Sequence, residues 1–218
     1  MGMLAVISAQ HLRRQLGAEL IAEVYSPLNS VLFREGVLQP SYITNRFYVA
    51  DKILICIGDS QPLTAGEVYT LADQILNVGE EFDVKRVYTT AASLSAFEGE
   101  PRVFGIVNKK ELVSSLDRLG VPVADGEGSI TGLNGVLLGV AAERGIEGLC
   151  LLGQIRFMDI PQPGSASAVL RVLTRMLDVQ IDLSDLDKEA SRIEESIRGS
   201  LKRAPPRGTE EKGLDYIG

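Results

Sequence analysis

Residues able to carry out nucleophilic or acid–base chemistry are sparse in this sequence. Its single histidine, His11, belongs to a helical pattern, and any Ser–His or Cys–His mechanism would have to use it. No serine or cysteine lies in a nucleophile turn of the G-x-S-x-G type, and Cys56 and Cys150 stand inside apolar runs typical of buried strands. We therefore expect His11 to be a solvated residue on a helix face and the protein to have no catalytic residues.

Metal-ligating patterns are equally sparse. The sequence contains neither H-E-x-x-H nor C-x-x-C, and its two cysteines are far apart. Paired carboxylates occur at residues 80–81, 194–195 and 210–211, on expected helix faces or in a polar tail, where runs of charge are usually solvated. The sequence predicts no metal site and no cofactor.

A glycine-rich segment, residues 126–135, leads into a helical pattern and is the strongest candidate for a ligand site. Free backbone N–H groups at a helix N-terminus can hold an anion. The segment lacks the Gly-Lys-Ser/Thr of a P-loop, and Glu127 lies within it. The favoured interpretation is a helix capped by Ser129 or Thr131, whose glycines approach the sheet closely at positions 132, 135 and 139. The alternative is a nucleotide- or anion-binding enzyme that uses this turn.

Asp59 and Gln154 each follow an apolar strand pattern. Open α/β sheets place ligands at these carboxyl ends of strands, so both residues are candidates to line a cleft. Polar residues at strand ends more often form turns, and we favour that role for both.

The overall composition is that of an ordinary globular protein. A chain of 218 residues, 45% of them hydrophobic, can bury one sizeable core. The net charge of −7 argues against binding to phosphate backbones, so no nucleic acid partner is expected. No run approaches the roughly 20 apolar residues that span a bilayer, and no secretory signal is recognisable. We expect a cytoplasmic protein without a membrane partner.

Apolar periodicity predicts helices and strands in alternation. Three- and four-residue spacing predicts helices over residues 3–16, 66–82, 109–119, 133–142, 165–177 and 183–197. Apolar runs predict strands over residues 20–25, 31–38 (a hairpin turning at 34–36), 46–49, 52–57, 86–90, 102–107 and 146–152. Residues 52–57 are expected near the sheet centre. The order implies an α/β fold, a three-layer α/β/α sandwich with a mixed sheet. Residues 1–199 form the single domain, and polar residues 200–218 form a flexible tail.

Four segments, in this order, resemble the proteasome assembly chaperone family in its archaeal-type form. They are residues 17–27 (GAELIAEVYSP), 57–62 (IGDSQP), 130–135 (ITGLNG) and 144–153 (RGIEGLCLLG). The resemblance implies a fold similar to that of nucleoside phosphorylases, without demonstrated catalysis. It also implies a homo-oligomer that binds α-subunits or assembly intermediates of the 20S proteasome. Because some members have been labelled ATP-using ligases by distant analogy, the alternative becomes an enzyme of the ATP-dependent ligase type that uses residues 126–135.

The resemblance further implies a docking role for the C-terminal tail. Family tails end in a hydrophobic residue, a tyrosine and one last residue, and they dock between α-subunits. The corresponding partner-binding residues of this chain are Leu214, Tyr216, Ile217 and Gly218. Here Tyr216 is third from the end instead of penultimate, which implies a shifted register or another role. Family members also open with a strand that this sequence lacks, so we expect an open edge or slot in the sheet.

Overall fold

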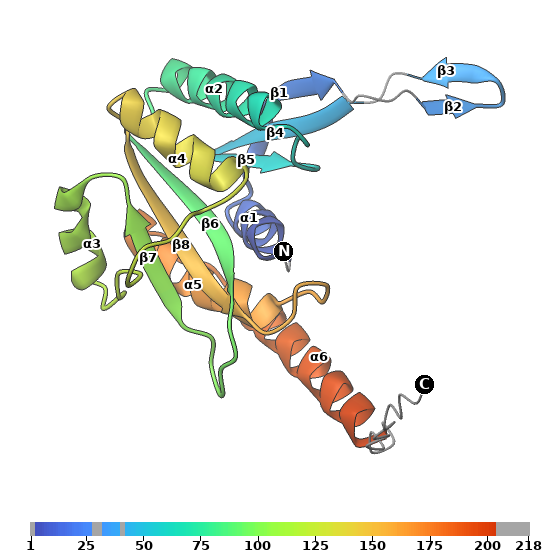
Figure 1. Cartoon of the computed structure of the whole chain (residues 1–218), viewed down its shortest axis with the longest axis vertical. Helices are drawn as coiled ribbons and strands as arrows, with labels where there is room; N and C mark the ends of the chain where they lie inside the picture. Colours follow the sequence, from blue (N-terminus) through green and yellow to red (C-terminus); the bar gives the residue numbers. More distant parts are fainter. Residues whose placement is uncertain (1–2, 28–31, 40–41, 204–218) are drawn as a thin grey trace, which may run out of the picture.

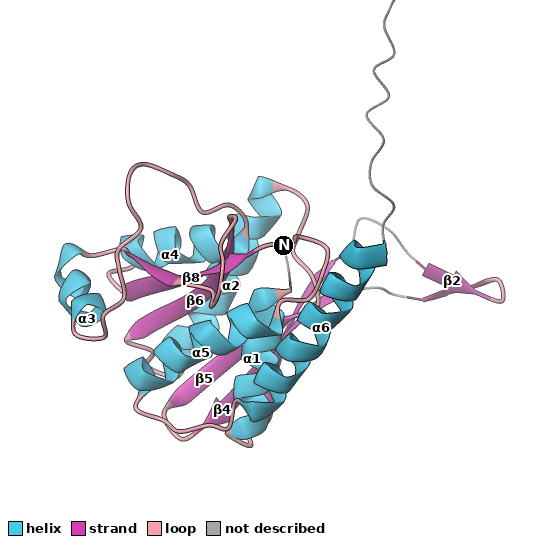
Figure 2. Cartoon of the chain, turned by 90° about the horizontal axis from the view of Figure 1, so that it is seen from below, coloured by secondary structure: helices cyan, strands magenta, loops and turns pink. Residues whose placement is uncertain are grey.

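The computed structural model describes residues 3–27, 32–39 and 42–203, and it arranges the helices in two layers around a layer of strands (Figures 1 and 2). One face of the strands is covered by α1 (Leu4–Gln15), α5 (Pro163–Leu177) and α6 (Ser184–Arg203). The other face is covered by α2 (Ala65–Glu81) and α4 (Leu133–Glu143). The predicted three-layer α/β/α sandwich is confirmed, whereas its likeness to nucleoside phosphorylases stays a prediction.

The strand layer consists of two three-stranded sheets. The first is antiparallel, in the order β1 (Glu19–Pro27), β4 (Tyr42–Ala50) and β5 (Ile53–Gly58). In the second, β8 (Glu147–Ile155) lies between β6 (Arg86–Leu94), to which it is parallel, and β7 (Val103–Val107), to which it is antiparallel. A separate hairpin pairs β2 (Leu32–Arg34) with β3 (Val37–Gln39). The mixed strand directions are those expected.

One strand lies elsewhere than its apolar run indicates. We expected β5 near the sheet centre, but it is an end strand of its three-stranded sheet, so that prediction is wrong. The run is apolar because helices cover both faces of the strand: Ile55 and Ile57 pack in the cluster with α1 and α5, and Leu54 and Cys56 pack toward α2. Burial of both faces does not require a strand on both edges. The absence of a first family strand stays a prediction.

Two helices have bounds that differ from the expected ones. Residues 109–119 form a 3₁₀ turn, Lys110–Leu112, followed by the short α3 (Val113–Asp117). At the chain's other end, α6 continues to Arg203, beyond the expected domain end at residue 199. The division into a domain of residues 1–199 and a tail of residues 200–218 stays a prediction, because residues 204–218 lie outside the described part.

Candidate functional site

The strand-end residues Asp59 and Gln154 are both held by neighbouring groups. An Asp59 carboxylate oxygen accepts a hydrogen bond from Arg46 Nη1 at 2.6 Å, and Arg46 Nε donates to Glu23 at 3.0 Å. These bonds raise the pKa of the Arg46 guanidinium, first through Asp59. Gln154 Oε1 accepts from the backbone N–H of Arg102 at 3.0 Å and joins β8 to the start of β7. Both side chains hold the fold together locally.

The glycine-rich turn folds against the first strand-end turn. A Cβ atom added to Gly132 would lie 2.5 Å from Oε1 of Gln61, so the structure brings residues 126–135 beside the end of β5. Gly132 also has φ of +75°, a conformation that suits glycine. A neutral amide thus lies against the residue that precedes α4.

Two expectations about this turn are wrong. Gly132 is the N-cap of α4 and no side chain caps the helix, so neither Ser129 nor Thr131 has the expected role. The glycines do not form a face against the sheet either. A Cβ on Gly135 would lie 1.9 Å from the Ile130 carbonyl oxygen, which means that the turn folds back on its own helix.

Two asparagines that the sequence analysis did not single out join neighbouring elements of the fold. Asn134 Nδ2 donates to the Thr90 carbonyl at 2.7 Å and ties the first turn of α4 to β6. Asn108 donates to the Ile146 carbonyl at 3.0 Å and accepts from the Gly148 N–H at 2.7 Å. The only sequence signal is that a polar residue stands next to an apolar run, which many surface residues share.

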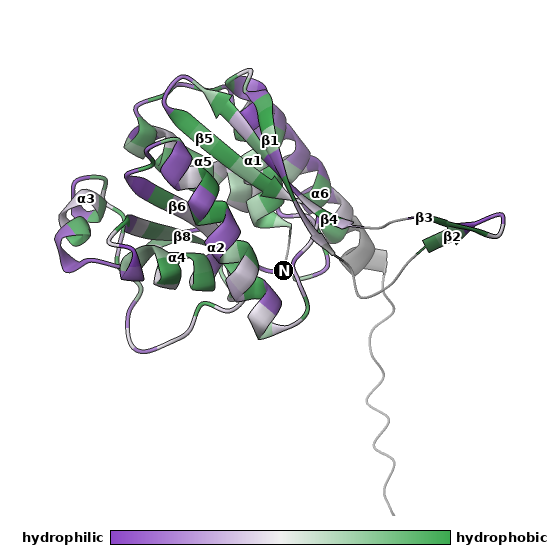
Figure 3. Cartoon of the chain, turned by 90° about the horizontal axis from the view of Figure 1, so that it is seen from above, coloured by the Kyte–Doolittle hydropathy of each residue, from purple (hydrophilic) through white to green (hydrophobic). Residues whose placement is uncertain are grey.

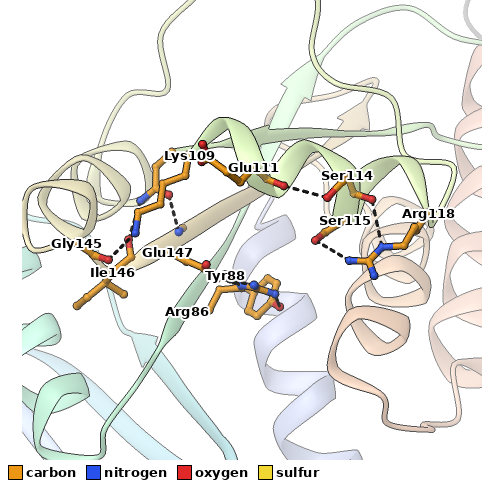
Figure 4. A network of polar contacts seen from close by, with 12 residues as sticks. Arg86, Tyr88, Lys109, Glu111, Ser114, Ser115, Arg118, Gly145, Ile146 and Glu147 are labelled. Atoms are coloured by element: carbon orange, nitrogen blue, oxygen red, sulfur yellow. Dashed lines mark hydrogen bonds and ion pairs between the residues drawn. The ribbon is translucent and has the colours of Figure 1, made fainter.

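The opposite end of the second sheet carries a polar network (Figure 4). Arg86 on β6 forms an ion pair with Glu147 on β8 and lies 3.4 Å from the Tyr88 hydroxyl. The Tyr88 hydrogen bond, followed by the Glu147 contact, raises the pKa of this guanidinium. Lys109 Nζ donates to the Gly145 carbonyl at 2.7 Å. The network fixes the register of the strands and closes the turn before β8.

The expected solvated position of His11 is wrong. Its side chain is only 3% exposed, and Nε2 lies 2.7 Å from the Asp182 carbonyl oxygen. A carbonyl can only accept, so Nε2 carries the hydrogen. Its helical turn faces the segment before α6, a long-range contact that local spacing does not reveal. His11 therefore has a structural role.

The two cysteines are free thiols, buried as expected at position 150 and half-buried at position 56. Burial raises the pKa of Cys56 to about 12 and also raises that of Cys150. Both thiols are protonated at neutral pH, and a protonated thiol is a poor nucleophile.

Two cavities lie at the margins of the molecule. The larger, of about 740 Å³, lies between the β4–β5 turn and the C-terminal end of α5 and includes Asp51, Lys52 and Asp178. The smaller, of about 180 Å³, lies beside α6 and includes Phe97, Arg156 and Ile193. In it, the Arg156 guanidinium stacks 4.7 Å from the centre of the Phe97 ring.

The expected docking residues Leu214, Tyr216, Ile217 and Gly218 lie outside the described residues. Within residues 3–27, 32–39 and 42–203, no cluster of three or more His, Cys, Asp or Glu side chains could hold a metal ion. No helix in the same ranges is long and apolar enough to cross a membrane.

The chain is similar to solved structures over most of its length. It aligns with Pyrococcus furiosus PbaB, an archaeal proteasome activator, at 31% identity and a TM-score of 0.80, covering 92% of this chain and 89% of PbaB. Pyrococcus furiosus PbaA, an archaeal homologue of proteasome-assembly chaperone, aligns at 32% identity and a TM-score of 0.75, covering 92% of this chain and 83% of PbaA.

Sequence comparison extends this similarity. The uncharacterised protein MJ1210 of Methanocaldococcus jannaschii is 27% identical over 100% of this chain and 88% of its own length. The model of the PAC2 family matches residues 1–200. The chain therefore belongs to the PAC2 family.

Proposed function

We propose that this protein is a non-enzymatic, cytoplasmic assembly factor that binds 20S proteasome α-subunits or their assembly intermediates as a homo-oligomer. The observation that carries the proposal is the alignment with PbaB, a proteasome activator, at 31% identity over 92% of this chain. PbaA, a homologue of proteasome-assembly chaperone, aligns over the same share. Two free cysteines are compatible with a reducing compartment.

The geometry of the described residues supports binding rather than catalysis. His11 is engaged with a backbone carbonyl, and both thiols are protonated at neutral pH. Asp59 pairs with Arg46, and Gln61 lies against Gly132 at the glycine-rich turn. Each candidate for chemistry is thus either in contact with another group of the fold or, for the two thiols, protonated. The ATP-dependent ligase alternative finds no support in the family or in the relatives described above.

We further propose that the tail residues Leu214, Tyr216, Ile217 and Gly218 contact the α-subunits. A tyrosine offers an apolar ring with a hydrogen-bonding tip, and a free carboxyl terminus can pair with a lysine. The chain ends Leu-Asp-Tyr-Ile-Gly, so the aromatic anchor stands two residues before the terminal carboxylate.

Co-precipitation with archaeal 20S proteasomes and isolated α-subunits tests both parts. The full chain, a chain lacking residues 214–218, Tyr216→Ala and the matched control Thr209→Ala are compared. We expect capture by the full chain and by the control, and a clear loss for the other two. Failure of the full chain to bind would overturn the proposed function, and equal binding by all four forms would remove the tail from it.

A further inference from the structure

The smaller of the two cavities lies in a groove beside the last helix, and we call it the α6 groove. One wall is α6, with Ile193 and Ile197, and the other is formed by the loops that follow β6 and β8, with Phe97, Arg156 and Phe157. These loops leave the carboxyl ends of two parallel strands, where open α/β sheets place their ligands. At about 180 Å³ the cavity is smaller than the roughly 300–1,000 Å³ of a small-molecule site, and it suits one or two side chains of a peptide.

The apolar stripe of α6 loses its cover along the helix. Leu186, near the start of the stripe, is 3% exposed and packs in the core cluster with α1 and α5. Ala190, Ile193 and Ile197 follow at the same helical spacing, but they are only half-buried and line the groove. Figure 1 shows this end of the helix extending away from the strands. The stripe therefore leaves an apolar surface for one more segment to pack against.

A cation lies among these apolar side chains. The Arg156 guanidinium is stacked on the Phe97 ring and donates a hydrogen bond through Nη2 to Glu194 at 2.9 Å. A guanidinium has five N–H donors, so Arg156 can bind a second carboxylate as well. The groove thus offers an apolar surface beside a donor for an acidic group.

The last residues of this chain have the matching chemistry and are within reach. The described part of the chain ends at Arg203, and Ile193 lies about 15 Å back along the helix from there. Residues 204–218 span up to about 50 Å when extended, which is more than enough to return to the groove. The segment 214–217 combines Leu, Tyr and Ile with the carboxylate of Asp215.

The short connection makes even a weak contact effective. A flexible linker of this length supplies an effective concentration of roughly 1 mM, so a contact whose free peptide has a dissociation constant of about 0.1 mM is formed about 90% of the time. The tail therefore needs only a few side-chain contacts to be held on the body of its own chain.

Two other surfaces suit this segment less well. The larger cavity lies where α5 ends and α6 has not yet begun, and its charged lining residues are Glu19, Asp51, Lys52 and Asp178. Three carboxylates against one ammonium group repel the acidic Asp215. The strands of the β2–β3 hairpin are apolar (Figure 3), but their large side chains are 60–75% exposed, so the hairpin is an open ribbon instead of a pocket.

We infer that residues 214–217 of this chain occupy the α6 groove, with the Tyr216 ring against Phe97 and Ile193 and the Asp215 carboxylate on Arg156. A tail held in this way is not available to a proteasome. The inference rests on the tail-docking part of the proposed function and adds its regulation, because the groove and the α-subunits compete for the same residues.

Tryptophan fluorescence of the full chain tests the position of the tail. The sequence contains no tryptophan, so Tyr216→Trp is a unique reporter, and Thr209→Trp is the matched reporter nearer the start of the tail. We expect position 216 to emit at shorter wavelength than position 209 and to be quenched less by acrylamide. Equal emission and quenching at the two positions overturns the inference. This comparison leaves the groove unaltered and does not depend on how a groove variant folds.

A change in the groove identifies the site. In the Tyr216→Trp chain, Ile193→Asp removes part of the apolar wall and adds a charge that repels Asp215. The control Ser196→Asp makes the same change of charge at an exposed position of α6. We expect Ile193→Asp to give position 216 the emission and quenching of position 209, and the control to have no effect. A reporter unaffected by Ile193→Asp overturns the inference, and Phe97→Ser gives the same reading if Ile193→Asp does not fold.

Co-refolding distinguishes the chain's own groove from that of a second copy. The Tyr216→Trp chain is refolded with a large excess of the Ile193→Asp chain without a reporter, so that any neighbouring copy carries the altered groove. We expect the emission of position 216 to stay at shorter wavelength. Its loss shows that the tail binds a neighbouring copy and overturns the inference.

Proteasome capture is a separate readout. Release of a tail that is held about 90% of the time should raise the apparent affinity for α-subunits about tenfold in Ile193→Asp. Unchanged capture by a variant whose tail is released overturns the regulatory role of the groove. Absence of capture by every form contradicts the proposed function, whereas the fluorescence still decides whether the tail occupies the groove.

Discussion

Removal of the His11 hydrogen bond is the most informative single perturbation of the fold. His11 and Gln15 are one helical turn apart on α1, and together they hold both backbone polar groups of Asp182. His11 Nε2 donates to its carbonyl at 2.7 Å, and Gln15 Oε1 accepts from its N–H at 3.1 Å. The side chain of Asp182 in turn accepts from the Ser184 N–H at 2.8 Å, at the start of α6. The contact therefore connects the first helix to the last.

His11→Phe keeps an aromatic ring at a position that is 3% exposed, but it removes the hydrogen bond to the carbonyl of Asp182. Because Asp182 is itself exposed, the expected loss is that of an ordinary hydrogen bond, about 0.5–1.5 kcal/mol of the free energy of unfolding. For a chain of this size each kcal/mol lowers the melting temperature by about 2–4 °C. His11→Gln retains a donor and should lose less. Urea unfolding followed by circular dichroism measures all three proteins.

The matched control is Arg14→Phe, which makes the same kind of change at an exposed position of α1. Exposed substitutions usually change stability by less than about 0.5 kcal/mol. If His11→Phe unfolds together with the wild type and Arg14→Phe, the buried position of His11 is refuted and the solvated histidine expected from the sequence is right.

Three further measurements examine other parts of the fold. Gly105→Ala should cost about 1–3 kcal/mol of the free energy of unfolding through overpacking, because the new Cβ would lie 2.4 Å from the buried Leu116 side chain. Gly139→Ala on α4 should instead raise the free energy of unfolding by about 0.5–1 kcal/mol, because a Cβ atom there would have no neighbouring atom within 4 Å. If the urea midpoints of the two variants do not move in opposite directions, this packing is contradicted. With its pKa raised to about 12, Cys56 should resist a thiol reagent at neutral pH until the protein is unfolded, and fast labelling of native protein argues against its burial. Hydrogen bonds from Ser184 at the start of α6 lower the pKa of the Asp182 carboxyl. The stability that this carboxylate contributes is therefore present above its unfolded pKa and lost as the pH falls below about 4. Asp182→Asn should make the free energy of unfolding depend less on pH in that range, and an unchanged dependence would contradict the capping role.

The local sequence pattern predicted most of the secondary structure but few of the contacts at the candidate site. The amphipathic run of α2 and the apolar run of β8 lie where their periodicity indicates, because burial of a helix stripe or a strand face leaves a direct trace in the sequence. Gly36 and its neighbours likewise predict the hairpin, since a tight turn needs positive φ. The bonds of Asn108 and Asn134 join segments 38 to 44 residues apart, and local pattern carries no record of them.

The sequence by itself determined the α/β class, the scarcity of catalytic groups and, through four short segments, the family resemblance. These properties depend on residue type and short-range spacing. Only the tertiary structure decided that His11 is buried, that β5 ends its sheet and that the apolar hairpin of β2 and β3 stands away from the body. Each of these outcomes depends on which distant segment covers a side chain or a strand edge. Asp182 accepts a hydrogen bond from His11, helices cover both faces of β5, and Phe33 is exposed.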